Sequence, residues 1–338
     1  DLGFQVGIGF AGEVATAVVG VIGSIILART LGPSSYGLFY IGLAIADFFE
    51  NPITGWAEAC KKRITESEFD SREAVGSVIV VTLALSGGGI PTAYLLISAL
   101  SQNDLLPLMV PILFVPLSLY WSLKTILSGK HNFSLSMWAK VIRTLLKVIL
   151  QILFVLVGLE IWGMVAGTVI SAIITVPVLY HWINLRPSIP SRDSLVSIAE
   201  FAKWSVPNGF VGTGLSKMDI ILLGWLVTAS SAGNYRVALT LSMPAVFISS
   251  VISTGLMGRV SNRKSRGLEW VSDINNALSF SSILSIPIFF GSIALGDLIV
   301  TTIYTGQYSG AGLFLVVLTL YQVLVTQTTS LSSVIQAL

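Results

Sequence analysis

Four polar side chains along the apolar stretch 137–158 could bind an anion. Lys140, Arg143, Lys147 and Gln151 follow one another at intervals of three, four and four residues, which places them on one stripe of a helix. If this helix crosses a membrane, such groups usually face the bundle interior or a wet cavity. The stripe therefore predicts a cationic cavity wall. Alternatively, Lys140 and Arg143 extend to the cytoplasmic headgroups, and Lys147 is the deeper cation.

Two carboxylates in the stretch 36–56 could take up a coupling ion. Asp47 and Glu50 lie on one helical face, and Pro52 predicts a kink close by. Carboxylates at such a weak point can bind H⁺ or Na⁺ during a conformational cycle. The alternative is a static pairing of these acids with the cationic stripe, which only holds helices together.

Two further carboxylates are candidates for ion coupling. Glu13 has no charged neighbour within a helical turn, so it must find a partner across the bundle or stay protonated. A coupling role and a structural role both remain open for it. Asp219 stands beside Lys217 in the stretch 206–227, and we expect these two side chains to pair locally.

A repeat organises the chain. The stretch 25–45, with a tight turn predicted at Gly32, is similar to the stretch that begins at Ile220, which indicates a duplicated chain. Arg29 and Arg236 flank the two copies. They could meet a departing sugar or phosphate, although anchoring in lipid headgroups is the alternative.

The composition predicts an all-α polytopic membrane protein. Of 338 residues, 54% are hydrophobic and 11% charged, against about 25% charged in soluble domains. About 20 apolar residues span a bilayer core. Ten such runs are predicted, at 6–27, 36–56, 75–100, 105–127, 137–158, 161–183, 206–227, 234–257, 274–294 and 312–333.

Several classes of function are excluded by what the sequence lacks. One cysteine, Cys60, allows no intrachain disulfide, and two histidines give no recognisable metal cluster. Phosphate-loop, HExxH and Gly-x-Ser-x-Gly patterns are missing, so we predict no catalytic residues, no enzyme and no ATP-driven pump. A net charge of +2 without a basic, aromatic-rich patch argues against nucleic acid as a partner.

The loops alternate in charge. Cations gather after the second, fourth, sixth and eighth apolar runs, which places the N-terminus in the cytoplasm and the Gly32 turn outside. Tryptophans near the ends of runs, Trp121 among them, are expected at the membrane interface. The chain begins at Asp1 without methionine and stops at Leu338 in an apolar run, so we expect both ends to be trimmed.

The segment 185–203 separates the two halves. It is not apolar enough to span a membrane, and Ser191 can cap a short amphipathic helix lying on the cytoplasmic surface. It could act as a hinge or as a passive linker. We therefore predict an N-terminal lobe at 1–184, this linker, and an incomplete C-terminal lobe at 204–338. The two homologous lobes, each of six-helix type, would surround a central cavity.

Five stretches, taken in order, resemble a known family. They are LARTLGPSSYGLFYIGLAI, KKRITE, the SGKHNF passage running to LVG, DIILLGWLV with SAGNYRVAL, and GDLIVTTIYTGQYSGAG. Together they are similar to the polysaccharide-biosynthesis flippases, the O-antigen and teichoic-acid type exporters of the MOP superfamily, which also contains the MATE antiporters. That family usually has 12 to 14 helices in two lobes.

The resemblance implies a function. A flippase of this type moves a polyprenyl-(di)phosphate-linked oligosaccharide across a prokaryotic cytoplasmic membrane by alternating access. It would contact its substrate, membrane lipids, and glycosyltransferases or a polymerase, and need no cofactor other than Na⁺ or H⁺ as a coupling ion. The rival hypotheses are a MATE-like multidrug or metabolite antiporter and a scaffold for a membrane glycosyltransferase.

Overall fold

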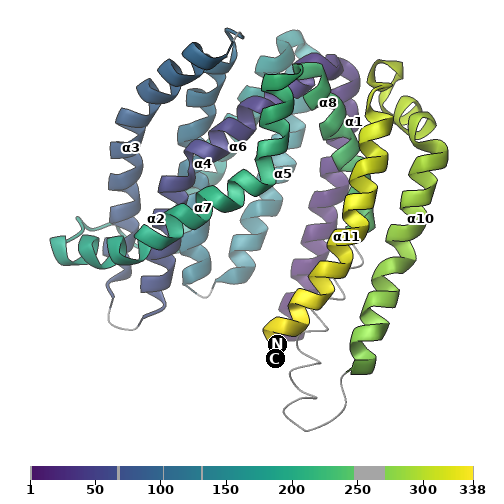
Figure 1. The fold of residues 1–338 in the computed structure, drawn as a ribbon. Coiled ribbons are helices and arrows are strands. Elements are labelled where there is room, and N and C mark those ends of the chain that lie inside the picture. Colours follow the sequence, from purple (N-terminus) through teal and green to yellow (C-terminus); the bar gives the residue numbers. More distant parts are fainter. Residues whose placement is uncertain (1, 67–68, 102, 131, 247–270, 338) are drawn as a thin grey trace. The chain divides into compact units, whose positions relative to one another are not determined.

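The computed structural model describes residues 2–66, 69–101, 103–130, 132–246 and 271–337 (Figure 1). These residues form helices and no strand, and seven helical stretches among them are long and apolar enough to cross a membrane. The helices are α1 (Leu2–Phe49), α2 (Asn51–Ile64), α3 (Ser71–Leu100), α4 (Leu106–Gly129), α5 (Phe133–Phe154), η1 (Val155–Leu159), α6 (Glu160–Ile183), α7 (Arg192–Leu226), α8 (Ala229–Ser242), α10 (Val271–Tyr304), η2 (Gly306–Tyr308) and α11 (Ala311–Ala337).

The helix α1 reverses direction at Gly32. This glycine has φ 72°, a conformation that residues with a Cβ rarely adopt, and Pro33 follows it where a helix tolerates proline best. Beyond the turn the buried Tyr36 hydroxyl lies 2.7 Å from the Ser24 hydroxyl, which ties the two arms together. Figure 1 shows the purple chain rising and then descending. The predicted hairpin is present.

The second arm of α1 continues into α2 with one break. The break falls at Glu50, and Pro52 lies in the first turn of α2, close to the predicted kink. At the other end of α2 the last turn contains the predicted basic cluster of Lys61, Lys62 and Arg63.

The helices α5 and α6 form a second sharp hairpin, where Gly158 has φ 95°. Two glycines one turn apart, Gly163 and Gly167, lie against α5. A Cβ on Gly167 would stand 2.6 Å from the backbone nitrogen of Gln151. Small residues of this kind allow membrane helices to approach closely, so glycine sets the spacing of this pair.

The helix α4 forms the centre of the first half of the chain. It contacts α1, α2, α3, α5 and α6, and 61% of its most apolar window is buried, the largest share among the candidate spans. Its interior prolines, Pro111 and Pro116, are tolerated there, as neighbouring helices allow in membrane proteins.

The helix α7 corrects one sequence-based expectation. A separate amphipathic helix was expected within 185–203, but α7 runs without interruption from Arg192 to Leu226 through Pro207. The expected cap is present, since the Ser191 hydroxyl accepts a hydrogen bond from the Ser194 amide. We attribute the continuity to packing: beside the proline, the Ser205 hydroxyl donates to the Gly55 carbonyl at 2.7 Å.

The described chain divides into two compact units, Asp1–Ala232 and Gly233–Leu338. We call them unit 1 and unit 2. This division groups α7 with the preceding helices. The predicted lobes at 1–184 and 204–338 stay a prediction.

Unit 2 is held by contacts of α10 and α11. The hydroxyls of Ser292 and Thr319 lie 2.7 Å apart, and Gln322 of α11 donates to Ser242 of α8. The run predicted at 234–257 is only partly described. Its first part forms α8, and residues 247–257 lie outside the described residues.

Candidate functional site

Charged side chains from three helices gather about halfway through unit 1. They come from the second arm of α1 and the turn that follows it, from α5 and from α7. Asp47 lies about midway between the Gly32 turn and the basic end of α2, and Arg143 lies at the middle of α5. Charges at this depth are costly in a membrane and mark functional sites or structural pairs. The cluster comprises Asp47, Glu50, Arg143 and Lys217.

Lys217 joins α7 to α1 within this cluster. Its Nζ lies 3.2 Å from Oδ2 of Asp47, and both side chains are partly exposed. The lysine therefore pairs with the neighbouring helix, and its expected local pairing with Asp219 stays a prediction. Asp219 is exposed, and its Oδ1 accepts a hydrogen bond from the backbone nitrogen of Ile220 at 2.8 Å.

Glu50 is the most buried member of the cluster. It is 3% exposed, and its Oε1 has no hydrogen-bond partner among the residues that the structure describes. The charges of Asp47, Arg143 and Lys217 all act on it. A buried carboxylate without a full set of partners is unfavourable. The charges of Arg143 and Lys217 favour its ionised form, whereas burial and the charge of Asp47 oppose it.

Arg143 is held by aromatic rings. Its guanidinium lies 4.2 Å from the ring centre of Tyr120 and 5.7 Å from that of Trp121, distances at which a cation is attracted to a ring face. Its Nε is buried without a hydrogen-bond partner in the described part of the chain. Sequence reasoning missed Tyr120 and placed Trp121 at the membrane interface. Two adjacent aromatic residues in an apolar run do not indicate which neighbouring helix they contact.

The residues of the predicted cationic stripe on α5 have different surroundings. Gln151 is buried against α6, where its amide nitrogen donates to the Thr168 hydroxyl at 2.9 Å and to the Met164 carbonyl. Lys140 and Lys147 are half-buried, and each interacts with other groups. Within the stripe, Arg143 is the residue that the structure brings to the acidic cluster.

The remaining predicted residues lie apart from this cluster or outside the description. Glu13 belongs to α1, but its side chain is outside the described side chains. Arg29 is exposed near the Gly32 turn, and Arg236 is half-buried in unit 2.

Polar pairs recur along the contact of α7 with α1 and α2, which also includes the rings of Phe48 and Phe210 at 5.1 Å. Residues later in α7 contact residues earlier in α1 and α2. The helix α7 therefore runs antiparallel to the second arm of α1 and parallel to the first arm, as the repeat predicts (Figure 1). The pairs along this seam are Ser205 with Gly55, Thr213 with Asn51, and Lys217 with Asp47.

The basic end of α2 extends the seam. Arg63 donates from Nε and Nη2 to the carbonyl of Ser197 at 3.1 and 2.9 Å. It also donates to Glu66, and this hydrogen bond holds the pKa of the Glu66 carboxyl below its ordinary value.

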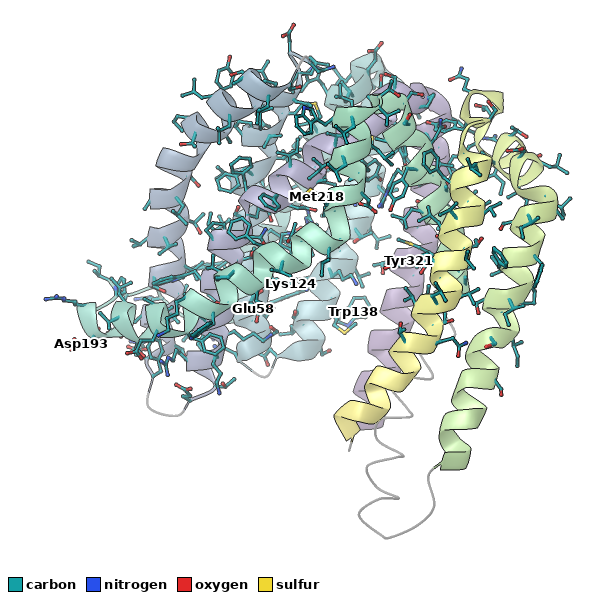
Figure 2. The ribbon with its side chains drawn as sticks, in the orientation of Figure 1. Glu58, Lys124, Trp138, Asp193, Met218 and Tyr321 are labelled. Atoms are coloured by element: carbon teal, nitrogen blue, oxygen red, sulfur yellow. The ribbon has the colours of Figure 1, made fainter. Side chains whose placement is uncertain are left out.

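An apolar pocket opens beside the charge cluster. Its volume is about 690 Å³, and it lies between the second arm of α1, the end of α3 and the end of α7. Phe48 and Met218 line it, and these residues directly follow Asp47 and Lys217 in the sequence. Figure 2 shows Met218 on α7. The polar lining residues, Ser101 and Asn103, lie beyond the end of α3.

The described residues contain no group of three His, Cys, Asp or Glu side chains that could hold a metal ion. The site therefore consists of a mixed charge cluster at mid-depth and an adjoining apolar pocket. Together they suit an amphiphile with a charged end.

These features define an all-helical, multi-pass membrane protein, and comparison with solved structures specifies its fold. The lipid II flippase MurJ in an inward closed conformation superimposes with a TM-score of 0.76 at 15% identity, over 96% of this chain and 76% of that one. An inward-facing MATE family transporter of the MOP superfamily gives 0.74 at 13% identity, over 95% and 81%. The chain has the fold of this superfamily.

The family follows from the sequence match. The profile described as "Polysaccharide biosynthesis protein" matches residues 26–312, and the chain belongs to this family. A relative from Haloferax volcanii, named "Probable low-salt glycan biosynthesis flippase Agl15", is 24% identical over 323 residues, which cover 91% of this chain. The chain spans 66% of the length of that relative.

Proposed function

We propose that this chain is the main part of a flippase that moves a polyprenyl-(di)phosphate-linked oligosaccharide across a membrane by alternating access. The observation that carries the proposal is Arg143, a cation held by two rings at mid-depth near the carboxylates of Asp47 and Glu50. The family match and the flippase names of Agl15 and MurJ support the same class. The product would serve the synthesis of surface polysaccharide or glycoprotein.

The cluster suggests how a phosphate could cross. Arg143 and Lys217 offer positive charge where a lipid-linked phosphate has lost most of its water, and guanidinium groups bind phosphate through paired hydrogen bonds. In the absence of substrate the acids neutralise these cations. A phosphate that takes their place would leave Asp47 or Glu50 without a partner, and that carboxylate would then take up H⁺ or Na⁺. We propose this exchange as the coupling step.

The first test is glycan export in a strain that lacks the gene. We expect Arg143→Ala to reduce export at least tenfold at equal membrane abundance, because the mid-depth cation is lost. Arg143→Lys should keep part of the activity, since it retains charge but not the planar guanidinium. Arg192→Ala, in the exposed first turn of α7, is the matched control and should export normally.

Normal export by a well-expressed Arg143→Ala protein would contradict the anion role and favour a scaffold for a glycosyltransferase or polymerase. Drug resistance conferred by the wild-type protein, without any change in surface glycan, would favour the antiporter. Glycosyltransferases or a polymerase are the partners we propose for the flippase.

We further propose the cytoplasmic membrane as the location, with the N-terminus inside. The alternating loop charge supports this orientation. In a Cys60→Ser background, a membrane-impermeant thiol reagent applied to intact cells should label Arg29→Cys and leave Lys203→Cys unlabelled until the cells are opened. Both positions are exposed, so the reverse pattern would invert the orientation.

A further inference from the structure

We infer that the apolar pocket between α1, α3 and α7 binds the isoprenoid tail of the lipid substrate while the phosphate is at the charge cluster. The inference rests on the proposed function and deepens it, because it assigns a second part of the substrate to a second site. The observation behind it is the shape and chemistry of the pocket beside Asp47 and Lys217.

The lining is suited to hydrocarbon. Fifteen of the seventeen lining residues are apolar or glycine, and the side chains include Ile45, Phe48, Leu96 and Trp225. A volume of about 690 Å³ falls within the range of about 300 to 1,000 Å³ typical of small-molecule sites. Such a lining favours hydrocarbon over water. In a membrane, however, the alternative environment for the tail is lipid and not water. Selectivity for the branched prenyl chain must therefore come from its fit to the pocket.

A glycine maintains the approach of α7 beside the pocket. A Cβ on Gly224 would collide with the side chain of Ile41, and both residues line the pocket. The close approach at this point shapes the wall between α1 and α7.

The position of the pocket favours a polyprenyl chain over the acyl chain of an inner-leaflet phospholipid. The pocket lies at the end of α3 and the end of α7, on the Gly32 side of the charge cluster, which is the outer half in the proposed orientation. A lipid that enters from the cytoplasmic leaflet has its tail directed toward this half. Half of the hydrocarbon core is about 15 Å thick, and an ordinary acyl chain from the inner leaflet ends near the midplane. A polyprenyl chain reaches beyond it.

Charge complementarity completes the assignment. One cation of the cluster, Lys217, directly precedes the lining residue Met218. A phospholipid keeps its headgroup at the surface, because a charge at the bilayer centre is costly. A substrate whose phosphate crosses the membrane must bring that charge to mid-depth. An apolar pocket joined to mid-depth cations therefore fits a lipid phosphate in transit.

The test is photolabelling of the reconstituted protein, read by peptide mass spectrometry. The probe is a polyprenyl phosphate with a diazirine at the far end of its tail, and the comparison probe is phosphatidylglycerol with a diazirine in one acyl chain. We expect the prenyl probe to label the ends of α3 and α7, and unlabelled polyprenyl phosphate to reduce this labelling at least fivefold. The phosphatidylglycerol probe should label these segments at least fivefold less.

Matched variants localise the effect. Leu96→Trp places a larger side chain at a lining position that is 48% exposed, so it should fold and should reduce labelling at least threefold. Leu95→Trp changes the neighbouring residue, which is 65% exposed and does not line the pocket, and it should label as the wild type does. Equal labelling by both lipid probes, or by both variants, would overturn the inference.

The outcome also separates this inference from the proposed function. If the wild-type protein transports substrate in proteoliposomes and the pocket stays unlabelled, the tail site is wrong and the flippase stands. If the pocket is labelled selectively but no substrate is moved, the tail site stands and the flippase proposal is wrong.

Discussion

The opposite charges of Glu50 and Arg143 partly compensate each other inside unit 1. Glu50 is buried, and its carboxylate is compensated by the charges of Arg143 and Lys217 rather than by a full set of hydrogen bonds. Arg143 is stacked on Tyr120, so its position depends on packing as well as charge. Removing one member of such a group leaves the other uncompensated.

This dependence predicts a measurable coupling energy. Arg143→Met and Glu50→Gln should each destabilise the protein, while the double variant should be more stable than the sum of the single changes predicts. We expect a coupling of about 0.5 to 3 kcal/mol, the range for residues that belong to one interacting network. Reversible unfolding in mixed detergent micelles, followed by circular dichroism, measures it. Strictly additive changes would show that the two side chains do not act on each other.

Single residues also show where sequence reasoning stops. The pattern of α5 left two roles open for Arg143, a cavity wall and the cytoplasmic headgroups, and it gave Lys147 as the deeper cation. Periodicity grouped Gln151 with Arg143, yet Gln151 faces α6. Residues two turns apart on a helix lie only approximately on one stripe. One of them can therefore pack against a neighbouring helix that the other does not contact. The partner of Lys217 was likewise set by the crossing of α7 over α1.

At the scale of elements, the hairpins were predictable and the extent of α7 was not. Gly32 and Pro33 have conformational preferences that act locally, so their turn could be predicted without tertiary information. The first turns of α7 depend on contacts remote in sequence. Arg63 holds the carbonyl of Ser197, and Ser205 holds that of Gly55. These contacts favour one continuous helix where local composition indicated two.

For the molecule as a whole, the seam between α7 and α1 is the natural place for movement in alternating access. It combines isolated polar pairs and glycines with one aromatic pair, Phe48 and Phe210, and few of the α7 side chains are buried. Contacts of this kind can separate without opening a large apolar core. Bistable interfaces of packed helices are a common basis for such transitions.

A reversible cross-link across this seam tests whether it must open. A Cβ on Gly209 would lie 3.8 Å from Cβ of Asn51, which is the usual separation in a disulfide. In a Cys60→Ser background, oxidation of the Asn51→Cys, Gly209→Cys double variant should reduce export at least tenfold, and a reductant should restore it. Each single variant, treated with the same oxidant, should be unaffected. Undiminished export after complete cross-linking would mean that α7 moves as one body with α2 and the adjoining arm of α1, and that access to the cluster changes elsewhere.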